Sequence, residues 1–225
     1  RAIDSHANSS LLRPFRQQLI DGVIASYQTP LGEPFNNKSL AEIAPKDRLS
    51  ELDFEMSLAK LSQGILASDI GKLLKSSLTE NDVLFAYADS LRDSSFDIPL
   101  AGLLNGSIDA VIRVTDNDGS PRLFITDYKT NRLDSDGIAT LMDAYAPNEL
   151  IHAMAHHHYP LQALLYGTAI YRMLRWRQPD LNADEVIAGV AYFFVRGMVG
   201  VGSPVDANGM PYGVFQWKAP RGLWE

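Results

Sequence analysis

Cysteine is absent from the 225 residues of this chain. Its absence excludes a disulfide framework and a thiolate metal site, and it predicts a cytoplasmic protein. Long apolar runs are lacking too: no stretch approaches the roughly 18 consecutive apolar residues of a membrane-spanning helix, and no charged-then-apolar leader opens the chain. We therefore predict a globular protein that does not contact a membrane.

Basic residues are fewer than acidic ones: the chain has 20 Lys and Arg residues, 27 Asp and Glu residues and a net charge of −7. This balance argues against a free-standing nucleic-acid-binding protein, because such proteins usually neutralise phosphates with a basic surface. The objection falls away if the acidic residues hold a cation, or if a larger assembly supplies the positive charge. The phosphate-binding pattern G-x-x-x-x-G-K-[ST] is missing as well, so no ATP site is expected in this segment.

Apolar residues are plentiful, at 46% of the chain, and allow a full hydrophobic core. The best-defined unit is a β-hairpin, in which two strand-like runs, "LLNGSIDAVIRVT" and "RLFITDYKT", flank the turn sequence "DNDGSP". With the loop centred near Asp118, antiparallel pairing places Asp109 opposite Asp127. Because side chains alternate along a strand, Asp127 and Lys129 share one face and Tyr128 points to the other.

Asp109 and Asp127 form an unfavourable pair unless something compensates their charges. Carboxylates directly opposite each other on two strands have Cβ atoms about 5 Å apart, and like charges at that distance destabilise a sheet. A divalent cation would compensate them, and Lys129 adds a second positive charge on the same face. The alternative is a solvated salt-bridge cluster on the hairpin, and spacing alone does not separate the two interpretations.

The rest of the chain alternates helical and strand-like patterns. Helices are predicted over residues 11–26 with Pro14 in the first turn, within 68–93 with Ser68 as a cap, over 137–158 and over 160–177. Strands are predicted over 51–58, where apolar and polar residues alternate, over the apolar run 186–195, and near 213–218. Strands interleaved with helices indicate an α/β architecture, with a central mixed β-sheet flanked by helices.

Three motifs in order, "GSIDAVIR", "LFITDYKT" and "HYPLQALLY", resemble the RecB-type nuclease domains of the PD-(D/E)XK superfamily. The superfamily pattern is an Asp, a variable gap, then Asp or Glu, any residue and Lys, which Asp109, Asp127 and Lys129 match. RecB-type nucleases add a downstream Gln-x-x-x-Tyr, matched by Gln162 and Tyr166. The later runs "YFFVRG" and "GVFQWKAPRGL" also fit, so the resemblance covers most of the chain.

This resemblance implies a restriction endonuclease-like core, with residues 1–225 forming a single RecB-type nuclease domain. Residues 1–100 are expected to form an N-terminal helical region that contributes the first core strand near 51–58. Residues 101–225 are expected to hold the catalytic hairpin, further helices and the remaining core strands. Arg1 stands where an initiator Met would, so we expect a fragment of a longer helicase-nuclease.

The resemblance also implies Mg²⁺-dependent hydrolysis of DNA phosphodiester bonds, with Mn²⁺ able to substitute. Asp109 and Asp127 would bind the metal, together with the backbone carbonyl of Tyr128. Lys129 would orient or help to deprotonate the attacking water and stabilise the charge that develops in the transition state.

Further positions follow from the same family pattern. Glu51 matches the acidic residue that RecB-type enzymes place beside the metal, with Glu55 as a second-ranked competitor. Gln162 and Tyr166 are expected to brace the site or to contact DNA. The family also uses a metal-binding His from an early helix, which His6 does not match, so its equivalent is expected before the first residue of this chain.

The sequence therefore predicts an exonuclease domain of a RecB-like helicase-nuclease, acting on single strands from unwound duplex ends in double-strand break repair and recombination. Its expected partners are DNA and RecC-like and RecD-like subunits. One alternative is a catalytically inactive copy of the fold that binds DNA ends or partner subunits, although the intact Asp109, Asp127 and Lys129 argue against it. A free-standing exonuclease is a third possibility, disfavoured by the negative net charge.

Overall fold

The structure of the protein is a computed structural model that describes residues 13–58, 64–92, 99–116, 118–133 and 141–224. The chain folds into two compact units, each assembled from separate segments. The first unit comprises residues 1–44, 128–150 and 193–215, and the second comprises residues 45–127, 151–192 and 216–225. In the described part of the chain, no helix is long and apolar enough to cross a membrane.

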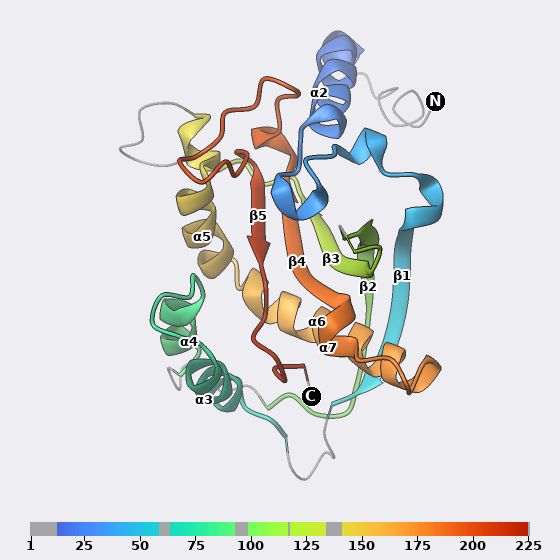
Figure 1. Cartoon of the computed structure of the whole chain (residues 1–225). Coiled ribbons are helices and arrows are strands. Elements are labelled where there is room, and N and C mark those ends of the chain that lie inside the picture. The colour runs from blue at the N-terminus through green and yellow to red at the C-terminus, as the bar shows by residue number, and fades with distance from the viewer. Residues whose placement is uncertain (1–12, 59–63, 93–98, 117, 134–140, 225) are drawn as a thin grey trace. The chain divides into compact units, whose positions relative to one another are not determined.

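Five strands form one sheet in the order β1-β2-β3-β4-β5, as Figure 1 shows. Their bounds are β1 (Arg48–Ser57), β2 (Leu103–Thr115), β3 (Pro121–Lys129), β4 (Ile187–Phe194) and β5 (Val214–Trp217). The β1–β2 and β2–β3 pairs are antiparallel. The prediction of an α/β fold with a central sheet is confirmed, and all the expected strands are present within a few residues of their predicted ends.

The hairpin of β2 and β3 has the predicted register. Six successive pairs run from Thr115↔Pro121, next to the turn, to Ala110↔Thr126. The turn is closed by a hydrogen bond of 2.9 Å from the backbone N–H of Asp116 to the carbonyl of Ser120, and Gly119 has a positive φ of 87°. Only glycine adopts that backbone conformation without steric cost, so the turn chemistry fixes the register of the whole hairpin.

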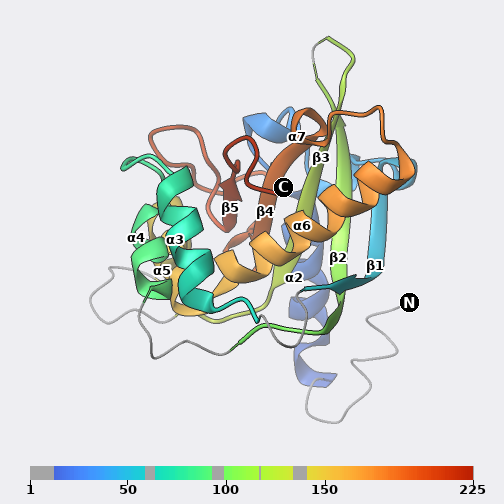
Figure 2. The same cartoon turned by 90° about the horizontal axis from the view of Figure 1, so that it is seen from below.

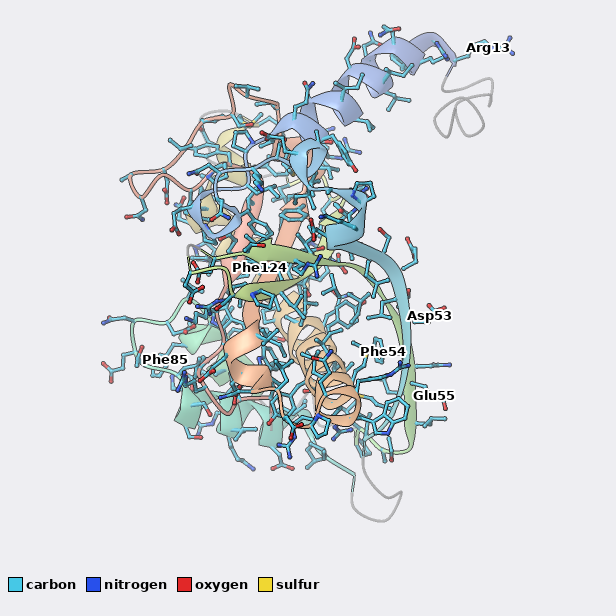
Figure 3. All side chains as sticks on the ribbon, turned by 45° about the vertical axis from the view of Figure 1, so that its right-hand side comes forward. Arg13, Asp53, Phe54, Glu55, Phe85 and Phe124 are labelled. Atoms are coloured by element: carbon cyan, nitrogen blue, oxygen red, sulfur yellow. The ribbon has the colours of Figure 1, made fainter. Side chains whose placement is uncertain are left out.

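Strand β1 lies at the edge of the sheet and begins three residues earlier than the sequence predicted. Its alternation is confirmed: Met56 is buried and Phe54 half-buried, whereas Asp53 and Glu55 are exposed. Figure 3 shows Phe54 pointing away from Asp53 and Glu55. The ring of Phe54 lies against Gly106 of β2. A Cβ at that glycine would fall 2.8 Å from the Phe54 ring, so there is no room for a side chain there.

Helix α6 (Tyr159–Arg177) belongs to the second unit and runs across one face of β2, β3 and β4 in Figure 2. The predicted start at Pro160 is confirmed within one residue, and Pro160 occupies the first turn, where its missing N–H costs nothing. The residue before the helix, His158, has a positive φ of 54° and separates α6 from α5 (Pro147–His156). The turn between these helices therefore lies before Tyr159, one residue earlier than the predicted interruption at Tyr159-Pro160.

The remaining helices include two departures from the predicted pattern. The second unit holds α3 (Ala67–Ser77), α4 (Phe85–Leu91) and the short α7 (Ala183–Val186). Ser68 lies inside α3 rather than capping it, since Leu66 is the N-cap. In place of a helix over 137–158 the structure has a 3-10 turn at Asp143–Tyr145 followed by α5, and residues 137–140 of that prediction lie outside the described residues.

The first unit contains α2 (Arg16–Gln28), which confirms the early helix, although Pro14 lies in a preceding 3-10 turn at Arg13–Phe15. Apolar side chains here are exposed rather than buried: Phe15, the residue just before the helix, is 56% exposed, and Val23 within it is 50% exposed. The end of α2 is anchored by Thr29, whose hydroxyl accepts a 2.8 Å hydrogen bond from the backbone N–H of Gly200. Periodicity thus identified the helix but not the side of it that is buried.

Candidate active site

The two predicted metal-binding carboxylates lie on neighbouring strands. Asp109 is a half-buried residue of β2, and Asp127, on β3, is only 4% exposed. Continuing the observed register by one pair beyond Ala110↔Thr126 places Asp109 opposite Asp127. Two carboxylates in such a position repel each other, and burial removes the water that would screen them. This is the kind of pair that a bound cation stabilises.

Strand β3 continues from Asp127 through Tyr128 to Lys129, its last residue. In the first unit, the ring of Tyr128 packs against that of Phe193, with ring centroids 5.7 Å apart. The chain that follows is also fixed in this unit: Arg196 donates a 2.8 Å hydrogen bond to the carbonyl of Thr130, and the Tyr145 hydroxyl donates one of 3.0 Å to the carbonyl of Asn131. Lys129 is therefore the last residue of a strand, and side-chain hydrogen bonds fix the two residues that follow it.

Glu51 has an unusual backbone conformation for a residue inside a strand, with a φ of +53°. The flanking pairs Ser50↔Ala110 and Leu52↔Ile108 place it beside Asp109 in the ladder. Its competitor Glu55 pairs with Asn105, four positions further along. The left-handed conformation costs a non-glycine residue free energy, and such strain is concentrated at functional sites. The register thus favours Glu51 over Glu55 as the third acidic residue.

Gln162 and Tyr166 lie one turn apart on α6 and are joined by a hydrogen bond of 2.8 Å from Gln162 Nε2 to the Tyr166 hydroxyl. The Tyr166 ring meets Phe54 edge-on, with centroids 5.8 Å apart and an interplanar angle of 79°. Burial raises the pKa of Tyr166, and the negative charges of Asp127 and Asp109 raise it further. The two family motifs, far apart in the sequence, are therefore electrostatically coupled in the folded second unit.

Tyr192 of β4 is a member of this group that the sequence did not single out. Its side chain is 1% exposed, and its hydroxyl donates to the carbonyl of Tyr159 at 3.2 Å and to Gln162 Oε1 at 3.3 Å. Burial raises the pKa of Tyr192 well above its usual value, with Asp127 adding to the effect. One feature of the sequence could have identified Tyr192: it is a tyrosine, with a polar hydroxyl, inside a run that is apolar on both faces of the strand. A buried tyrosine hydroxyl usually has a hydrogen-bond partner.

Oxygen atoms dominate the donors that this region offers to a metal. Asp109 and Asp127 supply carboxylates, and carboxylate and carbonyl oxygens are the protein ligands that Mg²⁺ prefers. Among the residues that the structure describes, His, Cys, Asp and Glu form no group of three or more that could hold a metal ion. The described side chains thus offer a pair of carboxylates rather than a full coordination shell, and His6 lies outside the described residues.

Comparison with known proteins relates nearly the whole chain to one kind of protein. The RecB subunit of the RecBCD enzyme of Mycolicibacterium smegmatis is 40% identical over a match that covers 98% of this chain and 20% of that subunit. The RecB subunit of Mycobacterium tuberculosis is 43% identical over 92% of this chain and 18% of its own length. That of Escherichia coli is 29% identical over 91% of this chain and 15% of its own. No protein-family model matches the chain.

These relatives are much longer than the chain. The chain spans about a fifth of the length of the mycobacterial subunits that it matches. The match extends over 98% of this chain. The resemblance to RecB that the sequence motifs indicated is therefore confirmed.

Proposed function

Because this chain is related to RecB subunits over nearly its whole length, we propose that it is a Mg²⁺-dependent DNA nuclease domain of the PD-(D/E)XK type. Within a longer helicase-nuclease, it would act as an exonuclease in double-strand break repair and recombination. The observation that supports the proposal is the register of the β2–β3 hairpin: its pair Ala110↔Thr126 is adjacent to Asp109 on β2 and to Asp127 on β3, and Lys129 follows two residues further along β3.

The described residues offer part of the coordination shell for the metal that this function needs. Asp109, Asp127 and the backbone carbonyl of Tyr128 would hold Mg²⁺, an all-oxygen set suited to a hard cation. When bound, the ion supplies positive charge to a phosphate and makes a coordinated water more acidic. Glu51, beside Asp109 in the ladder, would add a further carboxylate at the edge of the site.

The other residues would handle the substrate and its protons. Lys129 would donate hydrogen bonds to the attacking water or to a phosphate oxygen and stabilise the negative charge that develops there. Tyr166 would offer its hydroxyl to the DNA backbone beside the acidic pair, and Gln162 would hold Tyr166 through their 2.8 Å hydrogen bond. None of these groups reads a base, so the proposed cleavage does not depend on sequence.

The proposed partners follow from the names of the relatives, which are subunits of RecBCD enzymes. We propose that the chain works with RecC-like and RecD-like subunits and with single-stranded DNA from an unwound end. The net charge of −7 fits this assignment, because a domain fed with DNA by a larger assembly does not need its own basic surface.

Calorimetric titration with Mn²⁺, followed by degradation of single-stranded DNA, tests the proposal. The parent chain should bind the metal and cleave only in its presence, and Asp127→Ala should lose both properties. Asp118→Ala is the matched control, since it removes an exposed carboxylate from the turn of the same hairpin and should change neither. Metal binding without cleavage would favour the inactive DNA-end or partner-binding alternative, and a parent chain that binds no metal would refute the metal site.

A further inference from the structure

Tyr192, Gln162 and Tyr166 form a continuous hydrogen-bonded chain across the second unit, from β4 to α6. The Tyr192 hydroxyl lies 3.3 Å from Gln162 Oε1, and Gln162 Nε2 lies 2.8 Å from the Tyr166 hydroxyl. Tyr192 is only 1% exposed, and the negative charges of Asp109 and Asp127 act on both tyrosines of the chain. A buried tyrosine is thereby connected to Tyr166 through two side-chain hydrogen bonds.

These contacts have a direction. The Tyr192 hydroxyl has a single proton, which it shares between two acceptors, the carbonyl oxygen of Tyr159 and Gln162 Oε1. With Oε1 engaged there, the amide of Gln162 presents its N–H to Tyr166, whose oxygen accepts. The hydroxyl proton of Tyr166 is then free to be donated away from Gln162.

We propose that Tyr192 is a positioning residue of the nuclease site, which acts through Gln162 to fix the direction in which Tyr166 donates its hydroxyl proton. The inference rests on the proposed nuclease function. The proton would be offered to the carboxylate pair or to a phosphate bound beside it. The nearby negative charges of Asp109 and Asp127 favour this polarity, because a hydroxyl dipole is most stable with its proton toward an anion.

Packing makes Tyr192 a rigid support for this purpose. The Tyr159 ring stacks on that of Tyr192 with centroids 5.8 Å apart and an interplanar angle of 19°, and His157 stacks on Tyr159 at 5.2 Å. The hydrogen bond from Tyr192 to the Tyr159 carbonyl also ties β4 to the first turn of α6. Without the Tyr192 hydroxyl, the Gln162 amide could rotate so that its Oε1 accepts a hydrogen bond from the Tyr166 hydroxyl. The direction of the hydrogen bond between Gln162 and Tyr166 would then be reversed.

Tyr192→Phe is the direct test, because it removes a single oxygen atom. Loss of one orienting hydrogen bond should lower kcat roughly 3- to 10-fold, with KM for single-stranded DNA and the Mn²⁺ affinity nearly unchanged. In a Tyr166→Phe background, the same substitution should lower kcat no further. Additive effects of the two substitutions would overturn the inference, because a purely structural tyrosine would act independently of Tyr166.

Gln162→Glu tests the polarity itself. A carboxylate of the same shape accepts from both tyrosines, so Tyr166 would donate to residue 162 rather than to the site. This variant should lose at least as much kcat as Tyr166→Phe, and retention of parental activity would overturn the inference. Tyr171→Phe is the matched control, since it removes a phenol oxygen from the same helix and should leave kcat unchanged.

A readout that needs no cleavage separates this inference from the proposed function. The hydrogen bond donated by Gln162 lowers the pKa of Tyr166, against the raising effects of burial and the two carboxylates. If Tyr192 fixes that donor, Tyr192→Phe should raise the pKa of Tyr166, as measured by NMR of ¹³Cζ-labelled tyrosine and assigned with Tyr166→Phe. An unchanged pKa would overturn the inference. A parent chain without metal-dependent cleavage would instead refute the nuclease function.

Discussion

Glu51 combines a catalytic prediction with a strained backbone. Its φ of +53° is rare for a residue with a side chain, and it occurs in the middle of β1. Releasing this strain with Glu51→Gly should raise the free energy of unfolding by about 0.5–1 kcal/mol, the steric gain less the added entropy of glycine. Urea denaturation would measure the change. Glu55→Gly is the control on the same strand, and it should destabilise the protein because residue 55 has an ordinary backbone.

The same two glutamates can be separated by activity. Glu51 lies beside Asp109 in the ladder, whereas Glu55 pairs with Asn105. We therefore expect Glu51→Gln to reduce metal-dependent cleavage by at least tenfold, the effect of losing a charge-assisted contact of about 1.4 kcal/mol. Glu55→Gln should leave the rate within a factor of two or so. Equal losses of cleavage rate in the two variants, or a greater loss in Glu55→Gln, would contradict the assignment of Glu51 as the third acidic residue.

For individual residues, the sequence predicted the features that local chemistry determines. The turn residues set the hairpin register, and the register predicted that Asp109 and Asp127 lie opposite each other. Tyr192 was missed because its role depends on which helix crosses β4, a tertiary fact that strand periodicity does not contain. The strain at Glu51 was missed for a similar reason, since nothing in an alternating strand pattern marks a left-handed residue.

At the scale of elements, the contact between β1, β2 and α6 sets the position of Tyr166. The outer end of the Phe54 ring lies against Gly106, and the ring meets Tyr166 edge-on. Gly106→Ala would place a Cβ 2.8 Å from the Phe54 ring, so the ring must shift from its position against Tyr166. We expect a loss of about 1–3 kcal/mol in stability, as in other overpacked sites, together with a lower kcat.

Thermal unfolding and single-turnover cleavage would test this prediction together. The control is Gly22→Ala in α2, where nothing lies within 4 Å of the added Cβ. That substitution should stabilise the protein by up to about 1 kcal/mol through helix propensity and should leave cleavage unaltered. If Gly106→Ala were as well tolerated as Gly22→Ala, the close approach of Phe54 would not constrain the site.

Element boundaries show where sequence patterns stop being informative. The existence of α2, α3, α4, α6 and the five strands was predicted, but the helix expected over 137–158 begins only at Pro147 in the described part of the chain. Pro147 is suited to a helix start, and the preceding Asp143–Tyr145 segment forms a 3-10 turn instead. The exposure of the apolar side chains of α2 was equally unpredictable. Periodicity identifies an apolar face on a helix, but it does not show which other element packs against that face.

For the whole molecule, buried tyrosines predict how stability depends on pH. Burial raises the pKa values of Tyr192, Tyr166 and Tyr87 above the usual 10. A group whose pKa is raised by folding contributes stability that is complete below its unfolded pKa and is lost as the pH rises toward its folded pKa. The free energy of unfolding should therefore fall above pH about 10, with no thiol titration to complicate the curve, because the chain has no cysteine.

Tyr192, 1% exposed, should account for a measurable part of that fall. In the range where it is ionised only in the unfolded state, a single tyrosine contributes a slope of about 1.4 kcal/mol per pH unit. Urea denaturation between pH 8 and pH 11 should show a shallower decline of the free energy of unfolding for Tyr192→Phe than for the parent. If Tyr192→Phe were as steep as the parent, its hydroxyl would be accessible to water, and neither its burial nor its role as a rigid support for Gln162 would hold.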